Sequence, residues 1–125
     1  MSSLFSNGNP LLNPLLFNNF GYKVGLCSAL TQPKTLEEFV ASENQLLRGT
    51  AVFTVDFERI IRLKTNHDLT GINGTYTPTF LGVIIYDKST DEDLALLVIE
   101  PFTEGLTPSN NLETVVTLNM LKDGR

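Results

Sequence analysis

The chain contains one cysteine, one histidine and no tryptophan among its 125 residues. A lone cysteine, Cys27, excludes an intrachain disulfide, and one cysteine with one histidine cannot form a zinc site of the usual spacing. We interpret Cys27 as a small buried residue and His67, in "KTNHDLTG", as part of an exposed turn. A reactive Cys27–His67 pair is the alternative. No phosphate-binding glycine motif occurs either, so we expect no enzymatic activity, no cofactor and no metal.

Positive charge is also scarce. Nine basic residues stand against 14 acidic ones, which gives a net charge of −5 and a pI near 4.7. A nucleic-acid partner normally requires a basic patch, so we expect no direct binding of nucleic acid. No apolar run reaches the roughly 18 residues of a membrane span, and no basic segment precedes an apolar one as in a secretory signal. We therefore expect no membrane association and a cytoplasmic location, or assembly there into a larger particle.

Charge is entirely absent from the first 22 residues, which include the repeat "NPLLNPLLF". Its prolines favour extended or turning chain over helix. A disordered tail is usually poor in apolar residues and rich in charge, whereas this segment is the opposite. We predict an extended N-terminal docking arm over residues 1–33, with "GYKVGLCSAL" as a possible short strand, and a single β-rich domain over residues 34–125. The predicted partner-binding residues are the large apolar ones: Leu4, Phe5, Leu11, Leu12, Leu15, Leu16, Phe17 and Phe20.

One helix is predicted, at about residues 35–47. Thr35 followed by Glu38 makes a capping box, and apolar residues recur on one face. Gly49 stands where a C-terminal capping glycine is expected. An amphipathic helix of this kind packs against another element, here a sheet.

The remaining segments alternate or run apolar as strands do. "TAVFTVDF" and "ERIIRLKT" are followed by a predicted loop over residues 65–74, an apparent hairpin over 80–100 and a last strand over 112–121. The runs "LGVII" and "LALLVI" are typical of central strands covered on both faces. The predicted fold is mainly β: an antiparallel β-sandwich or open barrel with one flanking α-helix.

The hairpin tip is strongly acidic. Its oxygen-bearing residues alternate as at the start of a calcium loop: Asp87, Ser89, Asp91, Glu92 and Asp93. Such a loop requires glycine at position six and glutamate at position twelve, where this chain has Glu92 and Val98. We interpret the segment as a charged hairpin tip.

A small acidic β domain, a long apolar arm and no catalytic motif form a profile typical of virus and phage structural proteins. We expect a non-enzymatic assembly protein, a homo-oligomer that docks on neighbouring subunits through its arm. The first role expected is a virion component such as a phage capsid decoration protein, bound to itself or to a major capsid or other structural protein. A phage tail-tube or neck subunit is the alternative. From another class, the alternative is a small-molecule-binding β-barrel or enzyme, with Tyr76, Tyr86 and nearby acids at its mouth.

Overall fold

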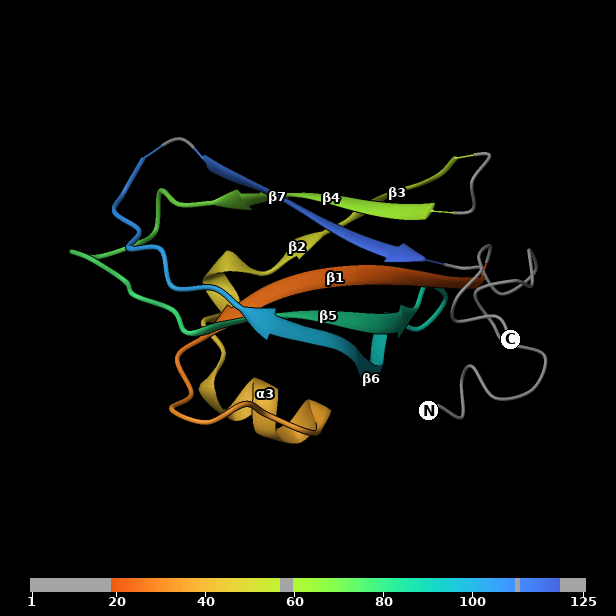
Figure 1. The fold of residues 1–125 in the computed structure, drawn as a ribbon, viewed down its shortest axis with the longest axis horizontal. Helices are drawn as coiled ribbons and strands as arrows, with labels where there is room; N and C mark the ends of the chain where they lie inside the picture. Colours follow the sequence, from red (N-terminus) through yellow and green to blue (C-terminus); the bar gives the residue numbers. More distant parts are fainter. Residues whose placement is uncertain (1–18, 57–59, 110, 120–125) are drawn as a thin grey trace.

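The structure is a computed structural model that describes residues 19–56, 60–109 and 111–119. These residues form two antiparallel sheets and one α-helix, α3 (Figure 1). In chain order the elements are β1 (Phe20–Cys27), α3 (Leu36–Ser42), the 3-10 turn η2 (Gln45–Leu47), β2 (Gly49–Thr50), β3 (Val52–Val55), β4 (Ile60–Asp68), β5 (Phe80–Asp87), β6 (Glu92–Pro101) and β7 (Asn111–Asn119).

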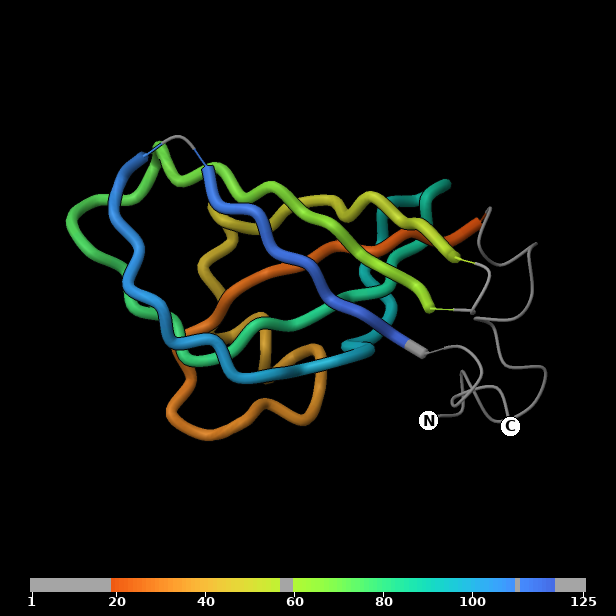
Figure 2. Tube along the Cα trace, turned by 45° about the horizontal axis from the view of Figure 1, so that its top comes forward, coloured from red at the N-terminus to blue at the C-terminus, as the bar shows by residue number. Residues whose placement is uncertain are grey.

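Sheet A has the strand order β2-β1-β5-β6, and sheet B has the order β3-β4-β7. The two sheets face one another, and α3 lies against the outer face of sheet A (Figure 1). The chain passes from β2 to β3 through Ala51 without reversing direction (Figure 2). This short connection links an edge of sheet A to an edge of sheet B. The predicted mainly β, antiparallel architecture with one flanking helix is confirmed.

The strand predicted within residues 21–30 is confirmed as β1, which pairs with β5 along its whole length. β1 therefore belongs to sheet A, although its sequence was included in the predicted arm of residues 1–33. Residues 1–18, with seven of the eight predicted partner-binding side chains, lie outside the described residues. Phe20, the eighth, is half-buried and packs against the core.

The core lies between the two sheets. Alternate residues of β1, β5 and β4 point inward, and Val24, Leu26, Val83, Ile61 and Leu63 are fully buried. Tyr22 and Phe53 stack across the two sheets with ring centroids 5.7 Å apart.

The predicted helix begins as expected but ends early. The Thr35 side chain accepts a hydrogen bond from the Glu38 amide at 3.1 Å, as in a capping box. The prediction of one helix to residue 47 is wrong, because Glu43 is extended and the chain restarts as the 3-10 turn η2. Gly49 is accordingly the first residue of β2 and not a helix cap. The cause is tertiary: Glu43 forms a β-bridge with Cys27, and the Asn44 amide donates to the Leu26 carbonyl at 2.9 Å, so the chain here pairs with the end of β1 instead of continuing the helix.

Phe39, the buried residue of α3, fits a recess made by two glycines. Gly25 of β1 and Gly82 of β5 are directly paired in the sheet. A Cβ atom on Gly82 would lie 2.6 Å from Phe39 Cε1, well inside normal contact. The missing side chains thus allow the aromatic ring to approach the sheet backbone.

Two strand predictions need correction. The loop predicted over residues 65–74 begins later, because β4 continues to Asp68. The run "LALLVI" was predicted as a central strand, but among the described residues β6 pairs with β5 alone and is an edge of sheet A. Its apolar character follows from contacts on both faces: Leu97 and Val98 pack against the core, and Leu96 and Ile99 pack against the cluster around Phe39 of α3. The hairpin over residues 80–100 is confirmed.

Candidate functional site

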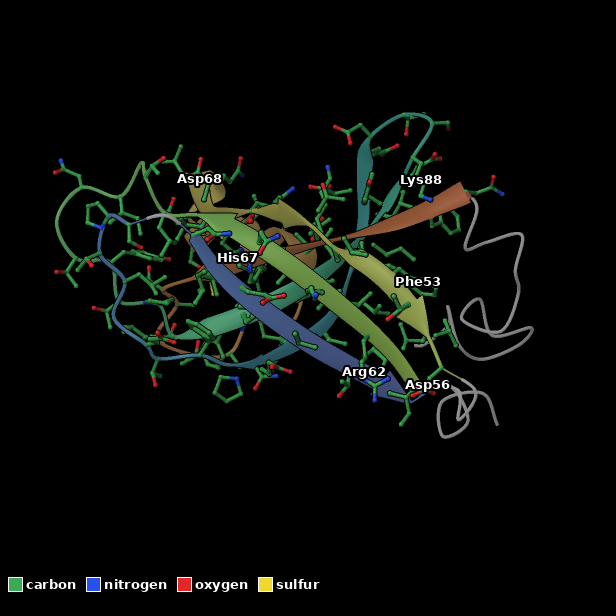
Figure 3. The ribbon with its side chains drawn as sticks, turned by 90° about the horizontal axis from the view of Figure 1, so that it is seen from above. Phe53, Asp56, Arg62, His67, Asp68 and Lys88 are labelled. Atoms are coloured by element: carbon green, nitrogen blue, oxygen red, sulfur yellow. The ribbon has the colours of Figure 1, made fainter. Side chains whose placement is uncertain are left out.

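The root of the predicted arm meets the domain at the start of β1. Here Lys88 N donates a hydrogen bond of 2.9 Å to the Asn19 carbonyl. Beside this point lies a surface hollow of about 360 Å³, close to Lys88 and Phe53 in Figure 3. It is lined by Phe20, Gly21, Tyr22, Thr50, Ala51, Phe53, Tyr86 and Lys88. Burial raises the pKa of Tyr22 to about 12, so this phenol stays neutral. The hollow combines aromatic walls with one cation and has the character of a contact surface.

A charged cluster lies on the outer face of sheet A, next to the end of α3. Arg48 donates to both oxygens of Glu43, at 2.8 and 2.6 Å, and to Asp93 Oδ2 at 2.6 Å. Lys23 Nζ lies 3.1 Å from Asp91 Oδ1 and 4.3 Å from the centre of the Tyr86 ring. The cluster joins the segment after α3, the strand β1 and the tip of the β5–β6 hairpin.

The burial of this cluster sets its energetics. The Glu43 side chain is 0% exposed, and those of Arg48 and Asp93 are 15% and 24% exposed. The hydrogen bonds that Arg48 donates to Glu43, and then the one that it donates to Asp93, raise the pKa of the Arg48 guanidinium. Asp93 Oδ1 has no hydrogen-bond partner, but Lys23 Nζ at 3.6 Å gives it a nearby positive charge. Each carboxylate in the cluster is thus matched by a cation, which indicates a structural role.

His67 is buried and structural, so its interpretation as part of an exposed turn is wrong. It lies in β4 (Figure 3) and is 0% exposed. Its Nδ1 lies 2.7 Å from the Leu47 carbonyl and its Nε2 lies 2.8 Å from Thr114 Oγ1. Since a carbonyl only accepts, Nδ1 carries the proton and Nε2 accepts from the threonine hydroxyl. Burial lowers the pKa of His67, so the ring is a neutral link between η2, β4 and β7.

Within the part of the chain that the structure describes, no base lies beside Cys27 to activate its thiol. It is fully buried in a small cluster with Phe39 and Ile84 under α3. Both ring nitrogens of His67 are bonded elsewhere, so the structure does not bring the two residues together. The interpretation of Cys27 as a buried apolar residue is confirmed.

The acidic hairpin tip is held by bonds within the turn as well as by the ion pairs of Asp91 and Asp93 described above. Asp87 Oδ1 accepts from the Ser89 amide at 2.8 Å and from its hydroxyl at 2.7 Å, and these bonds lower the pKa of Asp87. Asp91 adopts a positive φ of 62° at the turn. Among the described residues, no group of three or more His, Cys, Asp or Glu side chains is placed to hold a metal ion. The acidic residues lie at the turn between β5 and β6, as the interpretation as a charged hairpin tip predicts.

Tyr76 and Tyr86 do not share one cavity mouth. Tyr86 lines the hollow at the root of the arm, whereas Tyr76 lines an open hollow of about 530 Å³ beside Glu43 and the end of α3.

Valines project from the outer face of sheet B. Val52 on β3 and Val115 on β7 each lie directly opposite Lys64 on the central strand β4. They are 62% and 52% exposed. The alternation of residues along each strand predicts that these valines share a face with every second neighbour. It does not predict which of the two faces packs against the core.

Comparison with known proteins found no match to a family model, to a curated protein or to a solved structure. In the described part of the chain, no helix has the length and apolar character needed to cross a membrane.

Proposed function

We propose that this protein is a non-enzymatic assembly protein that docks on neighbouring subunits through its apolar N-terminal arm. The specific role that we propose is a virion component, a decoration protein on the outside of a phage capsid. The net charge of −5 supports a position away from packaged nucleic acid.

One observation carries the proposal: seven large apolar residues and no charge lie within residues 1–18, ahead of a domain that builds its sheets from residues 20–119. The proposed docking arm, now taken as residues 1–18, precedes all of these elements in the chain. Fully extended, 18 residues reach about 60 Å, which is enough to cross a neighbouring domain of this size.

The energetics require extensive contact. Ordering the arm on a partner costs conformational entropy at each residue, and burial of its large apolar side chains is the favourable contribution that offsets this cost. The arm therefore binds only where most of its leucines and phenylalanines are covered together. Pro10 and Pro14 reduce the cost, since they restrict the unbound chain.

The described reactive groups support a non-enzymatic role. Cys27 is buried under α3, both nitrogens of His67 are bonded, and Arg48 is held between two carboxylates. Each of these groups has a structural task.

The test compares the full chain with a chain that begins at Asn19. This boundary keeps β1, which a cut at residue 32 would remove together with its pairing to β5. Light scattering gives the mass of each chain, and circular dichroism checks that both are folded. We expect the full chain to form a defined oligomer and the shortened chain to be a folded species of lower mass. Equal masses for two folded chains would contradict the proposal.

Electron microscopy of the assembled full chain separates the two virion roles. Small closed oligomers support a decoration protein, whereas stacked rings or tubes support a tail-tube subunit. The alternative class, a small-molecule-binding barrel, is supported only if the shortened chain retains ligand binding with no change in mass.

A further inference from the structure

The two sheets have four edge strands among the described residues. These strands differ in how well they are protected against pairing with a further strand. β2 and β3 are short, with two and four residues. β6 has ten residues but carries two register irregularities opposite Val83/Ile84 and Ile85/Tyr86, and it ends at Pro101. Short length, bulges and proline are the devices by which edges avoid further pairing.

β7 carries none of these devices. Its nine residues pair with β4 in unbroken register from Asn111 to Asn119. Its sequence, "NLETVVTLN", holds one charge and neither glycine nor proline. β-branched residues at its centre favour strand pairing, and the backbone groups on the side away from β4 form a regular row. A long edge of this composition, without bulges, is a template for another strand.

The residues of β7 alternate cleanly between the two faces. Thr114 and Val116 are buried on the inner face, at 8% and 2% exposure, while Val115 on the outer face is 52% exposed. A second copy that pairs antiparallel across a two-fold axis normal to the sheet keeps the inner faces on the same side. Buried side chains of one copy then lie beside buried side chains of the other, and exposed ones beside exposed ones.

One register of this two-fold pairing uses the whole strand. With the axis at Val115, Val115 meets the partner's Val115, Leu112 meets the partner's Leu118, and all nine positions pair. Glu113 then lies opposite the partner's Thr117, so no like charges face one another. An axis at Glu113 would set two carboxylates together, and an axis at Thr117 would leave only five paired positions before Asn119.

We propose that β7 is the contact between two copies of this chain, which join their three-stranded sheets B into one six-stranded sheet across a two-fold axis at Val115. This inference rests on the proposed assembly function, because it names a surface on which copies meet. It involves a different part of the chain from the arm, so the two are tested separately.

The first test places a charge on the axis. Val115→Glu puts two carboxylates opposite one another in the dimer, whereas in the single copy the new side chain faces Lys64 on β4. Val52→Glu is the matched control, because Val52 is also exposed and also faces Lys64, but on the β3 edge. In the full chain we expect Val115→Glu to raise the dissociation constant of the pair by roughly tenfold or more. Val52→Glu should leave it unchanged.

The second test fixes the register with disulfides. Directly opposite residues of an antiparallel pair have Cα atoms about 4.5–5.5 Å apart, within disulfide reach. Val115→Cys should therefore give a disulfide-linked dimer on mild oxidation. Thr117→Cys should not, since its copies would be offset by about 13 Å along the strands. The native Cys27 is fully buried, and the unmodified chain controls for it.

The outcomes separate this inference from the proposed function. Weakened association in Val115→Glu alone, with crosslinking at residue 115 alone, is the expected result. Equal behaviour of Val115→Glu and Val52→Glu, or equal crosslinking at 115 and 117, overturns the β7 contact. If removal of residues 1–18 abolishes association while Val115→Glu has no effect, the assembly function stands and the β7 contact falls. If only Val115→Glu has an effect, the arm proposal falls instead.

Discussion

The buried pair between Arg48 and Glu43 gives a sharp prediction for stability. Arg48→Met keeps much of the side-chain volume but removes the two hydrogen bonds that the guanidinium donates to the Glu43 carboxylate, whose side chain is 0% exposed. Removing one partner of a buried ion pair costs about 3–5 kcal/mol, because the remaining charge is left without compensation. For a domain of this size the corresponding fall in the melting temperature is about 12–20 °C.

Urea unfolding followed by circular dichroism measures the change in the free energy of unfolding. Arg62→Met is the matched control, because the Arg62–Asp56 pair, at 2.7 Å, has side chains that are 47% and 27% exposed (Figure 3). An exposed pair of this kind contributes about 0–1 kcal/mol. The double variant Glu43→Gln/Arg48→Met should lose less stability than Arg48→Met alone, since the fully buried side chain at position 43 then carries no charge, while Asp93 loses Arg48 in both variants.

A loss below about 1 kcal/mol for Arg48→Met, equal to that of the surface control, would refute this reasoning. It would mean that water reaches Glu43 in the folded protein. A double variant less stable than Arg48→Met would refute it as well, because the unpaired carboxylate could not then be the source of the loss.

Two further predictions concern the helix recess and the buried histidine. Gly82→Ala should destabilise the domain by about 1–3 kcal/mol through overpacking against Phe39, whereas Gly71→Ala, with its nearest neighbour at 3.8 Å, should change little; equal thermal shifts would count against the recess. His67 has a lowered pKa when folded, so the unfolded chain binds a proton first, below about pH 6.5. Stability should fall as the pH drops through this range, and His67→Gln should flatten that slope in urea titrations at pH 7.5 and 5.5.

The sequence was sufficient for the fold class because the strands and the helix start carry local signals. The capping pair Thr35 and Glu38 and the hairpin over residues 80–100 follow from nearest neighbours in the chain. The end of α3 could not be predicted, because Glu43 leaves the helix to form a β-bridge with Cys27 of β1, which lies 16 positions earlier in the chain.

The environment of His67 was equally hidden from the sequence. Its neighbours "KTN" and "DLTG" resemble a polar turn, but pairing with β7 extends β4 through the histidine and buries its ring. Gly25 and Gly82 give a third example: each looks like an interruption of a strand, and only their register shows that they form one recess for Phe39. In all three cases the deciding contact joins residues from different elements.

The central claim is that the arm docks on another copy of the domain, and direct binding tests it best. Residues 1–18, fused to a soluble carrier, are titrated onto the chain that begins at Asn19, and binding is measured by fluorescence anisotropy. The account predicts saturable binding that is lost when Leu11, Leu12, Leu15 and Leu16 are replaced by serine. No binding to a folded domain, or equal binding by the serine variant, would contradict it.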